Sequence, residues 1–286
     1  MGVQTRPHAV AVLTIGCYAS VIFLGAVLLF QLEPMIAKAI LPWFGGGANV
    51  WTVCLLFFQV VLLAGYAYSH LFTRVVSARL QPWVHIALLL LSLAALPILP
   101  AMHWRPTGAE SPTWWILAIL TCHIGAPFMV LSATGPLMQS WFVRDLPGRS
   151  PYRLFALSNA GSLLALMGYP VLMETVLPLS GQATLWTGCY VLFIALCAVV
   201  AIRRGCLPAH RPAQPTGDRS SAPRHDNPSF AKVASWIALS ALGSVMLMAT
   251  SNRLSQDIAA VPMLWIAPLA TYLLTLVCCF ERDGWY

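Results

Sequence analysis

The sequence predicts an all-α fold, a polytopic bundle of about eight transmembrane helices. Of the 286 residues, 59% are hydrophobic and only 9% are charged, whereas soluble domains are about half apolar and about a quarter charged. Apolar runs of the length that crosses a bilayer as a helix, about 20 residues, recur along the chain. Runs such as 86–96 are apolar almost throughout and lack the alternation of a barrel strand. This composition excludes an ordinary soluble enzyme and a disordered chain.

Eight runs meet the length criterion. They are Ala9–Phe30, Val50–Leu71, Trp83–Ala101, Trp114–Leu137, Tyr152–Leu177, Leu185–Ile202, Ala231–Thr250 and Ala259–Phe280. The first run is longer than the apolar part of a signal peptide, and no small-residue cleavage site follows it. We therefore expect it to be retained as the first span.

Lysine and arginine residues predict the orientation. With the N-terminus in the cytoplasm, 13 of the 16 basic residues fall in inner segments, and three, Lys38, Arg105 and Arg253, fall in outer loops. Such a bias follows the positive-inside rule, and an even number of spans places both termini in the cytoplasm. The net charge of +7 is thereby explained by topology. The expected partner is the lipid bilayer, and no nucleic-acid partner is expected.

Composition divides the chain into three parts. Residues 203–230 are basic and rich in proline, with few apolar side chains, which predicts a disordered cytoplasmic linker. Before it, residues 1–202 form a six-span bundle of major-facilitator type. After it, residues 231–286 form a two-span segment, compatible with the start of a truncated second bundle.

A recurring pair of motifs predicts an inverted repeat within the first six spans. Pro34 precedes the second span, which carries Gly65-Tyr66, and Pro136 precedes the fifth, which carries Gly168-Tyr169. Units three spans apart face opposite sides of the membrane, as in many transporters. The long stretch around Pro34 has two interpretations: a tilted helix, or a helix broken at the proline beside a polar cavity.

Polar residues at membrane depth are the candidates for binding a substrate, because burying them is costly. Glu33 and Lys38 are expected to pair, and the first and last outer loops are expected to meet around one external pocket. The candidate substrate-binding residues are Gln31, Glu33, Lys38, Gln59, Asn159, Glu174, Asn252 and Asp257. Hydrogen bonds between helices, ion pairs at the interface and helix capping would use the same residue types.

Other chemistry has little support in the sequence. No catalytic residues are assigned, because the motifs of nucleotide-binding and hydrolytic enzymes are missing. The eight cysteines form no C-x-x-C pair, so no metal site is expected. His70 and His85 lie at similar depth on adjacent spans, which leaves a haem-binding subunit as a third alternative. No cofactor is otherwise expected.

Several motifs resemble the membrane region of the bacterial fused major-facilitator/spermidine-synthase-like family. They are QLEPMIAK (31–38), LPWFGGGANVW (41–51), FFQ (57–59), GYAYSH (65–70), LSATGPLMQSW (131–141), GRSPYRLFALSN (148–159) and DIAAVPMLW (257–265). The resemblance implies a multi-pass protein of the bacterial inner membrane. Family members continue into a cytoplasmic domain resembling aminopropyltransferases, which this sequence lacks, so no enzyme activity is expected of this chain.

Together these observations predict a transporter-like membrane component that moves a small polar or cationic metabolite such as a polyamine. The alternative is a membrane scaffold for a separately encoded aminopropyltransferase-like enzyme. The protein partner would then be a soluble synthase-like chain, and a homo-oligomer is the other possibility.

Overall fold

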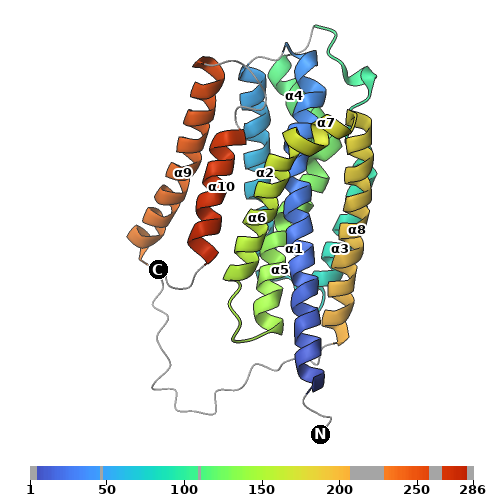
Figure 1. The fold of residues 1–286 in the computed structure, drawn as a ribbon, viewed down its shortest axis with the longest axis vertical. Coiled ribbons are helices and arrows are strands. Elements are labelled where there is room, and N and C mark those ends of the chain that lie inside the picture. Colours follow the sequence, from blue (N-terminus) through green and yellow to red (C-terminus); the bar gives the residue numbers. More distant parts are fainter. Residues whose placement is uncertain (1–4, 46–47, 109–110, 207–228, 258–265, 282–286) are drawn as a thin grey trace.

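The protein is a bundle of helices, as the sequence predicts (Figure 1). The computed structural model describes residues 5–45, 48–108, 111–206, 229–257 and 266–281, and these contain no strand. The α-helices are α1 (Thr5–Ile40), α2 (Ala48–Val75), α3 (Gln81–Ser92), α4 (Pro112–Leu120), α5 (Ala126–Asp145), α6 (Tyr152–Gly168), α7 (Glu174–Val176), α8 (Leu179–Cys206), α9 (Phe230–Asp257) and α10 (Ile266–Glu281). Two π-helical turns, Thr121–Gly125 and Tyr169–Met173, join α4 to α5 and α6 to α7.

Six stretches of the described chain are long and apolar enough to cross a membrane. They coincide with the first, second, fourth, fifth, sixth and seventh predicted runs, so the chain is a multi-pass membrane protein. The third and eighth runs hold shorter apolar helices. In the third, α3 has only 12 residues, or about 18 Å, because Pro97 and Pro100 follow it and a helix ends before proline. The start of the eighth run, 259–265, lies outside the described residues.

The first helix is continuous through Pro34. It has 36 residues, and Pro136 lies inside α5 in the same way. The interpretation of a helix broken at Pro34 is therefore wrong. Proline removes one backbone hydrogen bond, whereas a full break would leave several backbone groups without partners in lipid.

The helices pack in a pattern that is symmetric between two halves of the bundle. Helix α1 packs on α6, and α2 packs on α5; α1 also packs on α8, and α3 on α5. Helices α1, α2 and α3 belong to the first three spans, and α5, α6 and α8 to the next three. When the two sets of spans are exchanged in order, the α1–α6 contact becomes the α5–α2 contact, and the α1–α8 contact becomes the α5–α3 contact. This is the packing that the predicted inverted repeat requires. The later helices join the bundle through α10, which packs on α6, and α9, which contacts α2 and α10.

Close approach of α2 and α5 depends on Gly65. A Cβ at this position would overlap the hydroxyl of Ser132 and lie 3.0 Å from the Met129 carbonyl oxygen. We expect Gly65→Ala to lower the free energy of unfolding by about 1–3 kcal/mol, because the helices must separate. Titration with SDS in mixed micelles measures the free energy of unfolding of the variant and of the original chain.

Gly135→Ala on α5 is the matched control, since a Cβ there meets nothing within 4 Å. An alanine is favoured over glycine within a helix, so this variant should be no less stable than the original chain. Equal losses in the two variants would contradict the close approach of α2 and α5.

Candidate functional site

A groove of about 360 Å³ lies between α2 and α9. It is open along one side, because most of its α9 residues are exposed. The groove is lined from α2 by Trp51, Thr52, Leu55 and Gln59, and from α9 by Ser244, Val245, Met248, Ala249 and Asn252. None of these nine side chains carries a charge, and more than half of them are apolar.

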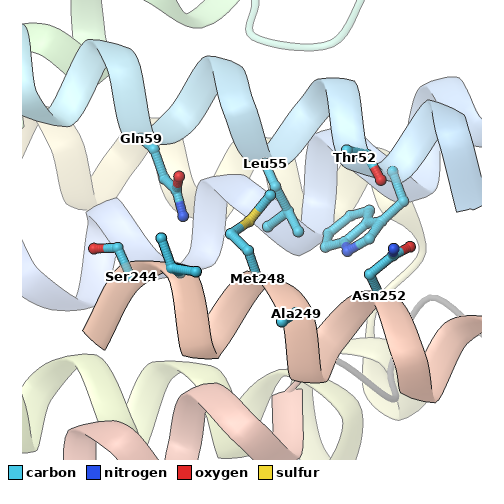
Figure 2. A pocket seen from close by; sticks show the side chains of 9 residues that line it. Thr52, Leu55, Gln59, Ser244, Met248, Ala249 and Asn252 are labelled. Carbon is cyan, nitrogen blue, oxygen red and sulfur yellow. The ribbon is translucent and has the colours of Figure 1, made fainter. Parts of the chain in front are cut away.

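The polar side chains of the groove gather at its two ends (Figure 2). Gln59 and Ser244 lie at one end, Thr52 and Asn252 at the other, and apolar side chains such as Leu55 and Met248 lie between them. The groove can therefore contact an apolar body along its middle and hydrogen-bonding groups at both ends.

Helix periodicity explains why these residues face one another. Thr52, Leu55 and Gln59 follow an i, i+3, i+7 spacing, which places them on one face of α2. Ser244, Met248 and Asn252 follow i, i+4, i+8 and share one face of α9. Two of the predicted candidates, Gln59 and Asn252, are far apart in the sequence and both line this groove, at its opposite ends.

Gln59 is a polar residue of the groove whose side chain is available to a ligand. Its side chain is half-buried near the middle of a membrane-spanning helix, and its amide makes no hydrogen bond to the rest of the described chain. An amide that is taken out of water without a partner is destabilising by on the order of 1–3 kcal/mol. A ligand in the groove would supply the missing hydrogen bonds.

The expected Glu33–Lys38 pair is wrong. Lys38 instead lies 2.7 Å from Glu174 at the start of α7, and both side chains are partly exposed. Five residues of helix turn through about 500°, so Glu33 and Lys38 point about 140° apart around α1. The pair joins α1 to α7 at the end of the bundle where α1 finishes, and being exposed it contributes little stability.

Of the remaining predicted residues, those whose side chains the structure describes do not line the groove. Glu33 is only 8% exposed, lies within electrostatic reach of Cys54 on α2, and has no hydrogen bond to the described residues. Asn159 on α6 is also buried, and its amide nitrogen has no partner there. Gln31 is half-buried. Asp257 ends α9, and its side chain lies outside the described part. The described candidates are thus divided between the groove, an ion pair and interior polar groups, and the last outer loop, 258–265, lies outside the described residues.

Sequence reasoning missed an ion-pair cluster at the opposite end of the bundle. Arg204 lies 2.9 Å from Asp145, and each side chain is 10% exposed. Tyr18 donates a hydrogen bond to Asp145 over 2.5 Å, and the Arg204 guanidinium lies 5.0 Å from the ring centre of Trp141. The cluster joins α1, α5 and α8. An acid and a base just beyond the inner ends of the fourth and sixth predicted runs were the available signal, but Arg204 was assigned to the 203–230 linker and Asp145 was not considered.

The two histidines proposed for haem have different surroundings. His85 is fully buried, and its Nε2 lies 2.9 Å from the Thr134 hydroxyl. That hydroxyl donates to the Val130 carbonyl, so the histidine nitrogen is the donor of the pair. His70 is exposed. The facing arrangement that haem ligation needs therefore has no support, and the described residues contain no cluster of three or more metal-binding side chains.

Comparisons of the chain with protein-family models, with curated proteins and with solved structures found no match. The groove and its chemistry are therefore the basis for a function.

Proposed function

We propose that the chain is a transporter-like membrane component that binds a small polar or cationic metabolite, such as a polyamine, in the groove between α2 and α9. The observation that carries this proposal is the Gln59 amide, which lines the groove at mid-membrane without a partner among the described residues. A polar group within a transmembrane span that lacks a partner is costly, and a bound substrate would offset that cost.

Two further features support transport over a purely structural role. The symmetric packing of the first six spans is typical of transporters with inverted repeats, whose substrates bind near the bilayer midplane. Glu33, a buried carboxyl group on α1 within electrostatic reach of α2, would be stabilised in its charged form by a cation that passes close to it.

Uptake of radiolabelled spermidine into vesicles that contain the purified chain tests the proposal. We expect saturable uptake above that of empty vesicles. Gln59→Leu should lower uptake about tenfold, the effect of one hydrogen bond of about 1.4 kcal/mol, and Glu33→Gln should lower it as well. Val60→Leu is the matched control, because Val60 is the next residue on α2 and is exposed outside the groove.

Absence of uptake above empty vesicles would refute transport of a polyamine. Equal losses of uptake in Gln59→Leu and Val60→Leu would show that uptake does not depend on the groove.

The proposal includes a location in the bacterial inner membrane with both termini in the cytoplasm. It is supported by the arginines at the end of the bundle where α5 and α8 finish, including Arg144, Arg203 and Arg204. Tags at either terminus should be reached by impermeant labels only after the cells are opened. Labelling of intact cells would contradict this orientation.

A scaffold for a separately encoded aminopropyltransferase-like enzyme is the second candidate. It rests on the sequence resemblance, and co-purification of such a soluble chain would support it.

A further inference from the structure

The distance between the two polar ends of the groove between α2 and α9 limits which ligands can bind there. Thr52 and Gln59 are seven residues apart on α2, and Ser244 and Asn252 are eight apart on α9. At 1.5 Å per residue, the polar ends of the groove are about 10–12 Å apart along both walls. The polar residues are therefore separated by a similar distance on both helices.

The middle of the groove offers no hydrogen bond. Leu55, Met248 and Ala249 lie between the two polar ends (Figure 2). A polar atom in the middle of a ligand would lose its water without gaining a partner, whereas methylene groups would gain from burial by about 0.8 kcal/mol each.

From this arrangement we infer that the groove binds a linear aliphatic molecule with one hydrogen-bonding group at each end and an apolar chain between them. The inference rests on the proposed function and narrows its ligand to molecules without a polar atom between their two ends. Spermidine, which has an internal amine, is therefore expected to bind more weakly than a diamine of matching length. Single bonds near 1.5 Å advance an extended chain by about 1.25 Å each. Two end groups about 11 Å apart are therefore joined by about eight methylene groups.

Charge is not what the groove selects. No charged side chain lines it, and Glu33 is not among its lining residues. Amide and hydroxyl oxygens accept hydrogen bonds from an amine or an alcohol alike. The length of the chain and the presence of both end groups are therefore the features that decide binding.

A chain-length series tests this directly. The purified chain in lipid nanodiscs is titrated with 1,n-diamines from four to twelve methylenes and with the 1-aminoalkanes of the same lengths. Dividing each diamine affinity by that of its monoamine removes the general effect of hydrophobic partitioning. We expect this ratio to peak near eight methylenes, about tenfold above its value at four, the effect of one added hydrogen bond. The matching diols and alcohols should peak at the same length.

Variants at the two ends connect the peak to the groove. Gln59→Leu and Asn252→Leu should each abolish the peak and leave monoamine binding within about twofold, because one end group loses its partner. Val60→Leu should retain the peak. Unfolding in SDS checks that each variant is folded, and Ser244→Ala provides a smaller change at the Gln59 end with the same expected direction.

The outcomes separate the inference from the proposed function. A ratio that does not depend on length, or a peak that survives both end variants, overturns the inference even if spermidine uptake persists. Binding of no member of the series overturns it as well, and absence of uptake then removes the proposed function too. A peak with diamines but not with diols would contradict the conclusion that charge does not decide binding, and would restrict the end groups to amines.

Discussion

Arg204→Leu is expected to lower the free energy of unfolding by about 3–5 kcal/mol, because it leaves a buried charge without its ion-pair partner. The change leaves Asp145 at 10% exposure without its ion-pair partner, and removing one member of a buried pair leaves the other charge uncompensated. It also removes the cation from the face of Trp141. Unfolding of the purified protein by SDS in mixed micelles measures the loss.

Two variants make this test specific. Arg203→Leu is the matched control, because Arg203 is the preceding residue of α8 and makes no ion pair with the described residues; its effect should stay within about 0.5 kcal/mol. The double variant Asp145→Leu, Arg204→Leu should lose less than Arg204→Leu alone, since no charge is then left unpaired. A double variant that is as unstable as the single one would show that packing, and not charge, holds this end together.

Gln182→Leu should have the second largest effect, a loss of about 2–4 kcal/mol in the free energy of unfolding. Gln182 on α8 is fully buried. Its amide nitrogen donates to the carbonyls of Met173 and Leu177 at 3.2 and 2.9 Å, and its oxygen accepts from the Tyr169 hydroxyl at 2.9 Å. Leucine would leave these groups buried with fewer partners, at about 1–3 kcal/mol for each unsatisfied group.

The neighbouring α8 residue Thr184 supplies the control. It is exposed and hydrogen-bonds only the preceding turn of its own helix, so Thr184→Val should change stability by no more than about 0.5 kcal/mol. Tyr169→Phe removes one of the three Gln182 contacts and should have an intermediate effect. If Gln182→Leu behaves like Thr184→Val, the amide does not hold the end of α6 to α8.

The position of Gln182 explains a departure from regular helix that the sequence only hinted at. Pro170 predicts a kink in the fifth span, and the structure places the π-helical turn Tyr169–Met173 there. Irregular backbone in a membrane must find partners for its freed carbonyls. Gln182 supplies them from the next helix, and nothing in the sequence near Gln182 shows that its side chain would reach back to Met173.

The candidate site was predictable in part and for a similar reason. Gln59 is conspicuous because an amide in the middle of an apolar run is costly to bury, and Asn252 is conspicuous at the end of one. Neither residue indicates that the other lines the same groove. The pairing depends on α9 lying beside α2, and these helices are separated by more than 150 residues of chain.

The sequence by itself determined the apolar runs, their helical state and their passage through a membrane. These follow from local composition, because a backbone in lipid must satisfy its hydrogen bonds within each segment. What only the tertiary structure decided is which helices face each other. Lys38 binds Glu174 rather than Glu33, and Arg204 binds Asp145 across 59 residues of sequence. Such contacts depend on the direction of a side chain around its helix and on the neighbour that packs there, and local sequence specifies only the first of these.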